Sequence, residues 1–123
     1  MTQEDKDLLL KYLCMALPYR MAIKDDYGDT IFIDYNDVHI QNYFEGIVDG
    51  VVRPYLRPMS SMTEDEEKEY DATFATIKLA DGHYDSTMTY KSFDFLNAHH
   101  FDYRGLIEKG LAIEVTEENN PYV

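Results

Sequence analysis

The sequence predicts a single α+β domain in which an N-terminal helix packs on a mainly antiparallel sheet, with further helices in the C-terminal half. Three observations indicate this fold class. Apolar residues near the N-terminus follow helical spacing, the apolar residues that come next alternate with polar ones, and helix-capping patterns lie in the second half. The 123 residues fit one hydrophobic core. We expect the domain to span residues 1–115 and residues 116–123 to form a polar, frayed tail.

The first predicted helix begins at Thr2, a favourable N-cap residue, and ends before Pro18. Leu9 and Leu13 keep the spacing of one helix face. The second half of this helix is nearly uncharged, so we expect it to be covered on most sides and to bury Cys14.

The next segment predicts a β-hairpin. Ile31 and Ile33 recur at every second position, the period of a strand, and the sequence DDYGD ahead of them supplies the aspartates and the glycine of a tight turn. We expect two more strands, near residues 38–40 and 47–52.

The segment RPYLRPMSSM contains two prolines, each of which lacks an amide donor and restricts the residue before it to extended backbone. It predicts an extended connector over residues 53–62. Thr63 and Glu66 then form a capping-box pattern. This pattern predicts a second helix that carries Ile77 toward the core and ends at the turn of residues 80–82.

The C-terminal part predicts two short helices between two strands. Residues 84–90 are rich in Thr and Tyr and favour a strand. Ser92 is expected to cap one helix and Asp102 to cap another, which Gly110 ends. Leu111, Ile113 and Val115 recur at every second position and predict the last strand.

The charge of the chain excludes several classes of function. A net charge of −13 repels phosphate backbones and anionic membrane surfaces, so we expect no direct binding to nucleic acid or to a membrane. No apolar stretch approaches the roughly twenty residues of a membrane helix. The one cysteine excludes an intramolecular disulfide framework and fits a reducing compartment. We therefore expect the protein in the cytoplasm.

The sequence AHHFDYR raises the question of a catalytic or metal centre. Neighbouring residues on a helix point about 100° apart, so His99 and His100 are poorly placed to chelate one ion. Asp102 is expected to bind backbone amides, which competes with a role as general base. We therefore expect no metal and no cofactor. The alternative is a small hydrolase or metal-dependent enzyme centred on His99, His100 and Asp102, with Arg104 beside them.

Other catalytic motifs are missing from the sequence. The six glycines form no phosphate-binding loop, and Ser60 and Ser61 lack the glycines of a nucleophile elbow. The aspartates of DDYGDTIFIDYND do not keep the register of a calcium-binding EF-hand loop.

The acidic stretch of residues 25–52 is the first candidate interaction surface. It holds seven acidic residues and neither Lys nor Arg, and it could imitate nucleic-acid phosphates in a basic groove of a nucleic-acid-binding protein. Arg53 and Arg57 could grip an acidic partner, but the glutamates of the following helix are their expected partners. The acidic candidates are Asp25, Asp26, Asp29, Asp34 and Asp37.

The segments LLLKYLCMALPYR, RPYLRPMSSMTEDEEKEY and SFDFLNAHHFDYRGLIEKGLAIE resemble a group of small hypothetical proteins of bacteroidete gut bacteria and of their phages and prophages. The resemblance covers most of the chain, from about Leu8 to Glu114. It implies no activity, cofactor or site residue, because none is known for that group. The mobile-element setting that it implies favours a host-interaction or counter-defence role.

These observations predict a non-enzymatic protein that binds another macromolecule, with a protein as the expected partner. A homo-oligomeric assembly protein is a further alternative.

Overall fold

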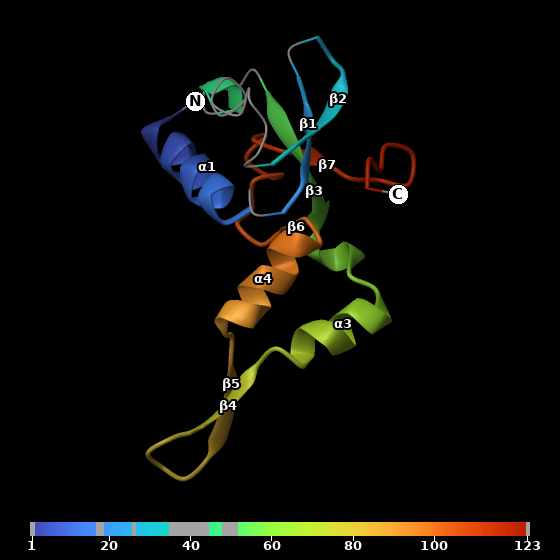
Figure 1. Cartoon of the computed structure of the whole chain (residues 1–123). Helices are drawn as coiled ribbons and strands as arrows, with labels where there is room; N and C mark the ends of the chain where they lie inside the picture. Colours follow the sequence, from blue (N-terminus) through green and yellow to red (C-terminus); the bar gives the residue numbers. More distant parts are fainter. Residues whose placement is uncertain (1, 17–18, 26, 35–44, 48–51, 123) are drawn as a thin grey trace.

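The computed structural model describes residues 2–16, 19–25, 27–34, 45–47 and 52–122 and confirms the α+β fold class (Figure 1). Strands β2, β1, β3 and β6 are neighbours in one mixed sheet, in which β7 also pairs with β3, while β4 and β5 form a separate ribbon. The elements of the described residues are, in chain order, α1 (Gln3–Ala16), β1 (Met21–Lys24), β2 (Thr30–Ile33), β3 (Arg53–Pro58), η1 (Met59–Ser61), α3 (Glu64–Asp71), β4 (Ala75–Lys78), β5 (Tyr84–Thr87), α4 (Tyr90–Ala98), β6 (Phe101–Asp102) and β7 (Ile113–Glu114).

Helix α1 confirms the first predicted helix. The Thr2 side chain accepts a hydrogen bond from the Asp5 amide at 3.1 Å, and the Asp5 carboxylate accepts one from the Thr2 amide at 3.2 Å. Leu9 and Leu13 are buried against the sheet. The expectation that Cys14 is buried is wrong, because it lies on the side of the helix that faces away from the core and is exposed.

The predicted hairpin is confirmed as β1 and β2, which pair antiparallel from Met21↔Ile33 to Lys24↔Thr30. The Asp25 carboxylate accepts hydrogen bonds from the amides of Tyr27 and Asp29 and so closes the turn. The expected strand at residues 38–40 lies outside the described residues. Residues 45–47 are helical rather than extended, so the strand expected to begin at residue 47 is wrong there.

Strand β3 occupies the segment that was expected to be a connector. It pairs antiparallel with β1 and parallel with β6 and β7, so the connector prediction is wrong. Proline favours the extended backbone that a strand needs, and the ladder is built from other groups of β3. The Arg57 amide donates to the His100 carbonyl at 2.8 Å, and the Leu56 carbonyl accepts from the Val115 amide at 2.8 Å.

The two faces of the sheet bury different residues because side chains alternate along each strand. Helix α1 covers the face that holds the main core. A smaller cluster on the other face consists of Ala22, Tyr55 and Val115, with Ile113 and Tyr122 packed against it. The main core consists of Leu9, Tyr12, Leu13, Ala16, Met21, Ile23, Ile33, Ile47, Val52, Leu56, Leu106, Leu111 and Ala112.

Helix α3 confirms the capping box but is shorter than predicted. Thr63 accepts from the Glu66 amide and Glu66 accepts from the Thr63 amide, as expected. The helix ends at Asp71, and Ile77 lies exposed in β4 instead of in the core. Apolar residues at positions 75, 77 and 79 also fit the period of a strand, which is the pattern that the fold uses.

The C-terminal elements depart from the prediction by small shifts. Thr89, not Ser92, is the N-cap of α4, and Ser92 occupies the third helical position of the capping box. Asp102 does bind backbone amides, since its two carboxylate oxygens accept from the Leu106 and Ile107 amides at 2.9 Å each. The segment after Asp102 is a series of turns rather than a regular helix.

The segment after β7 is anchored to the sheet, so the expectation of a frayed tail is wrong. The Tyr122 hydroxyl accepts from the Ala22 amide at 3.1 Å and donates to the Tyr55 carbonyl at 2.7 Å. It therefore bridges β1 and β3 next to their register pair Ile23↔Pro54. Burial raises the pKa of the Tyr122 hydroxyl, which keeps its proton available for this bridge.

Replacing Tyr122 with Phe should lower the free energy of unfolding by about 1–3 kcal/mol, because the Ala22 amide and the Tyr55 carbonyl lose their partner. Chemical denaturation measures the change. Tyr27→Phe is the matched control, since Tyr27 is 86% exposed. Equal stabilities of the two variants would contradict a bridging role for Tyr122.

Candidate functional site

A hollow of about 980 Å³ lies where β3, α3, the end of α4 and the segment after β7 meet. Its volume is in the range of small-molecule sites. Four of its side chains are basic or imidazole groups in a chain that is otherwise strongly acidic. The lining residues that carry polar or aromatic groups are Arg20, Phe32, Arg57, Ser61, Thr63, Glu66, His99, His100, Thr116, Glu117, Asn120 and Tyr122.

Arg57 and Glu66 form a bidentate ion pair in one wall of the hollow. The two N–O distances are 2.7 and 2.8 Å, and the side chains are only 19% and 16% exposed. The Arg57 guanidinium also lies 4.2 Å from the centre of the Phe101 ring. The hydrogen bonds that Arg57 donates to Glu66 lower the pKa of the Glu66 carboxyl to about 2. The prediction that Arg57 pairs with a glutamate of the following helix is confirmed.

His99 is the C-cap residue of α4 and stands beside the same carboxylate. Its Nδ1 lies 3.4 Å from Glu66 Oε2, and its ring packs 4.4 Å from the centre of the Phe95 ring. The Glu66 carboxylate therefore contacts Arg57, the Thr63 amide and His99 at the same time.

His100 has left-handed backbone geometry, with φ of 64°, which is unusual for a residue with a side chain. Its imidazole stacks on Tyr122 with a centroid distance of 3.7 Å and an interplanar angle of 7°. Burial lowers the pKa of His100 to about 4, and His99 and Arg57 add to the effect. The ring is therefore neutral at physiological pH.

The other members of the AHHFDYR cluster lie elsewhere. The Asp102 carboxylate is occupied by two backbone amides and does not line the hollow. Arg104 contacts Met15 Sδ at 3.1 Å and lies over the Tyr103 ring. The fold thus brings the two histidines together with Arg57 and Glu66, and it separates them from Asp102 and Arg104.

Hydroxyl groups near the histidines are engaged in backbone contacts. Ser61 Oγ donates to the Pro58 carbonyl at 2.7 Å, and Thr63 Oγ1 accepts from the Glu66 amide at 3.2 Å. Within the described residues, no group of three or more His, Cys, Asp or Glu side chains is arranged to hold a metal ion. Among the described helices, none has the length and apolar character needed to cross a membrane.

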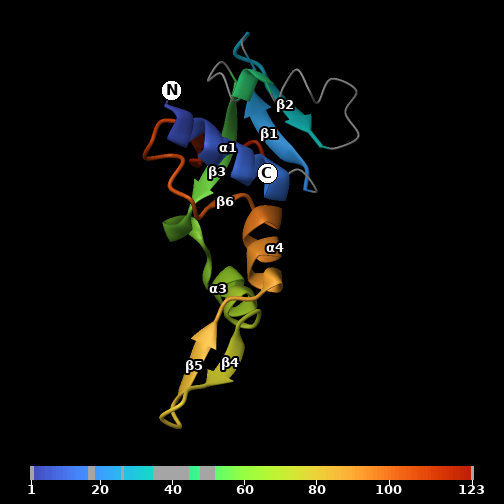
Figure 2. The ribbon, with the colours of Figure 1, turned by 90° about the vertical axis from the view of Figure 1, so that its left-hand side faces the viewer.

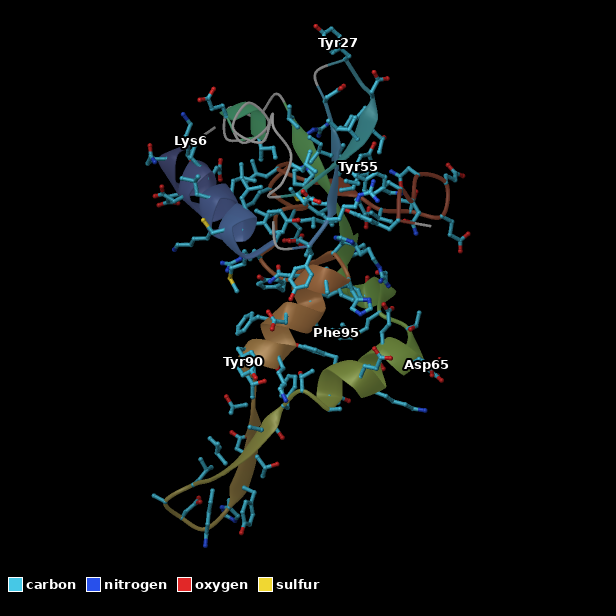
Figure 3. All side chains as sticks on the ribbon, in the orientation of Figure 1. Lys6, Tyr27, Tyr55, Asp65, Tyr90 and Phe95 are labelled. Atoms are coloured by element: carbon cyan, nitrogen blue, oxygen red, sulfur yellow. The ribbon has the colours of Figure 1, made fainter. Side chains whose placement is uncertain are left out.

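The acidic candidates of the first hairpin have different roles. Asp25 holds the turn, Asp29 is exposed, and Asp34 is half-buried and engaged in an interaction of its own. Figure 3 shows Tyr27 at the tip of this hairpin. Asp26 and Asp37 lie outside the described residues. Arg53 is exposed at the start of β3.

A second acidic surface lies on α3, where the sequence had suggested only a helix. None of its residues is buried, and five of its six acidic side chains are exposed. Figure 3 shows Asp65 on the outer side of this helix. The signal was present in the sequence EDEEKEYD, in which a polar helix has almost no apolar face. The acidic residues exposed on α3 are Glu64, Asp65, Glu67, Glu69 and Asp71.

No protein-family model matches the chain, and neither a curated protein nor a solved structure matches it. Function therefore has to be inferred from the chemistry of the molecule itself.

Replacing Glu66 with Gln should destabilise the protein by about 2 kcal/mol at neutral pH, because Arg57 loses a charged partner. The folded protein holds the pKa of Glu66 below its ordinary value. The ion pair therefore contributes fully above pH 4.5, and the contribution is lost as pH falls toward 2. Chemical denaturation over this range measures the difference between wild type and variant, which should shrink in acid. Glu67→Gln, on the exposed side of α3, is the control, and an equal loss there would contradict the assignment.

Replacing His100 with Phe should remove one source of acid sensitivity. The unfolded chain protonates this histidine near pH 6.5 and the folded chain only near 4, so the wild type loses stability as pH falls between these values. The variant keeps a flat ring against Tyr122 but cannot take up the proton. The difference in unfolding free energy between the two proteins should change by about 2 kcal/mol across this window. Parallel stability curves would contradict the burial of a neutral imidazole.

Proposed function

We propose that this protein acts without catalysis, by binding a basic protein through its acidic exterior. The observation that carries the proposal is the distribution of charge on α3. This helix buries no residue and leaves five carboxylates exposed, so its outer face contributes charge rather than core packing.

The chemistry of the hollow supports a structural use of its ionisable groups. Glu66 is shared between Arg57 and His99, and the hydroxyls of Ser61 and Thr63 bond to the backbone. Nucleophilic catalysis needs a hydroxyl or thiol within hydrogen-bond reach of a base, and these hydroxyls have other partners.

The chemistry of the partner follows from the charge. A net charge of −13 favours association with a surface rich in Lys and Arg and speeds the encounter. The basic groove of a nucleic-acid-binding protein has this character, so mimicry of a nucleic acid is the form of binding that we propose. The resemblance to small proteins of phages and prophages favours a counter-defence role for such mimicry.

Reversing the charge of α3 tests the proposal. The triple variant Glu67→Lys, Glu69→Lys and Asp71→Lys should capture basic proteins from a bacteroidete lysate about tenfold less well than the wild type. Mass spectrometry identifies the captured proteins. Capture by the wild type should weaken with rising salt, and added duplex DNA should displace the captured proteins.

The control variant carries the same number of reversals at exposed acidic residues outside α3, namely Glu108, Glu114 and Glu118. It has the same net charge as the α3 variant. Equal capture by both variants would mean that the loss of capture comes from net charge alone, and it would refute a role of α3. Capture that ignores both salt and duplex DNA would refute mimicry.

A further inference from the structure

The β4–β5 ribbon projects away from the rest of the molecule in two perpendicular views (Figures 1 and 2). Its strands pair only with each other among the described residues, and all eight strand residues are exposed. A two-stranded ribbon without a covering layer is marginally stable in water. We therefore expect contacts at the two ends of the ribbon to keep it ordered.

Both ends of the ribbon are pinned by hydrogen bonds. At the tip, the Leu79 amide donates to the His83 carbonyl at 2.7 Å, and Gly82 supplies the positive φ of the turn. At the base, Thr89 Oγ1 donates to the Thr73 carbonyl at 2.7 Å, and Thr73 Oγ1 bonds to the buried Ser92 Oγ at 2.7 Å. The ribbon is thus held in one orientation in advance, which lowers the entropy cost of binding.

The two outer edges of the ribbon differ. Hydrogen-bonded pairs alternate with non-bonded pairs along an antiparallel ladder. Because Leu79 bonds to His83, the backbone N–H and C=O groups of Ile77 also point to β5, whereas the backbone amides of Thr76 and Lys78 point outward. On the β5 edge, the outward amide of Ser86 already donates to the Asp85 carboxylate at 2.8 Å. The edge of β4 is therefore the more open of the two for another strand.

The side chains beside this edge are apolar on one face. Ile77 and Leu79 lie two residues apart and so share a face, and they are 43% and 40% exposed. Tyr84 stands on the opposite face, across from Lys78. An incoming strand could cover Ile77 and Leu79 while its backbone pairs with β4.

The charge around the ribbon selects the partner. Residues 64–87 hold eight acidic residues and two lysines. A second copy of this chain would bring like charges together, whereas a segment rich in Lys or Arg would meet opposite charge.

We propose that the outer edge of β4 is a docking site for an extended basic segment of another protein, which adds to the ribbon as a third strand. This inference rests on the proposed function, since it names the element on which the basic partner docks. Backbone pairing along β4 gives the geometry, and the acidic side chains of α3 and the ribbon give the preference for positive charge.

Synthetic peptides of known chemistry test the docking site. A short peptide of alternating lysine and valine should bind the full chain and shift the amide resonances of residues 75–79. A peptide of alternating glutamate and valine should not bind. The same lysine–valine peptide with every backbone amide N-methylated has the same charge but lacks the N–H groups for strand pairing. Binding of the N-methylated peptide as tight as that of the unmethylated peptide would overturn the proposal.

Two variants locate the contact. Thr76→Pro removes an outward amide from the β4 edge and should weaken the lysine–valine peptide about tenfold, whereas Ser86→Pro on the other edge should leave binding unchanged. If Thr76→Pro does not fold, the double variant Ile77→Ser and Leu79→Ser gives the same test. Its control is Tyr84→Ser on the opposite face. Unchanged binding after substitution of the β4 edge or its apolar face would overturn the proposal.

The outcomes separate this inference from the proposed function. If charge reversal on α3 abolishes capture while Thr76→Pro binds normally, the protein still binds a basic partner and only the docking site is wrong. If neither the α3 charge reversal nor Thr76→Pro weakens binding, both the proposed function and the docking site are refuted. Self-association of the wild type that Thr76→Pro abolishes would identify a second copy as the occupant and overturn the proposed partner.

Discussion

One arginine, Arg57, connects the main sheet, helix α3 and the end of helix α4. The Arg57 guanidinium is held by Glu66 of α3 and lies over Phe101 of β6, while its backbone amide bonds to His100. Partial burial strengthens this pair relative to one on the open surface. The sheet, the acidic helix and the end of α4 are therefore fixed relative to one another around a single cation. The ribbon beyond α3 is held at its base by the hydrogen bonds of Thr73 with Thr89 and Ser92.

The elements that depend on nearby residues could be predicted from the sequence. The cap at Thr2, the turn closed by Asp25 and the capping box of Thr63 and Glu66 each join residues no more than four positions apart. Their physical causes are local hydrogen bonds, which the sequence order displays directly. The pairing of Arg57 with a glutamate of α3 was accessible for a related reason, since α3 follows β3 closely in the chain.

The elements that depend on distant residues could not be predicted. The prolines of β3 suggested a connector, and only pairing with β1, β6 and β7 makes that segment a strand. Ile77 fits both a helical and an extended period, and the choice is made by the end of α3 at Asp71. In the site, the neighbourhood of the two histidines was visible, but the left-handed geometry of His100 and its stacking on Tyr122 were not. The stacking follows from a tertiary contact that has no local signature, whereas the left-handed geometry belongs to the position after the C-cap of α4.

The bridge made by Tyr122 also constrains how the chain folds during its synthesis. The hydroxyl bonds to an amide 100 residues earlier, between strands that form much of the sheet. The ribosome has therefore released the first hairpin and β3 long before the group that completes their junction exists. Until then Ala22 and Tyr55 have open polar groups in an apolar setting, a state that favours chaperone binding or mispairing. The closing step itself is short, because β7 already pairs with β3 and only the segment from Thr116 to Tyr122 is left to be placed.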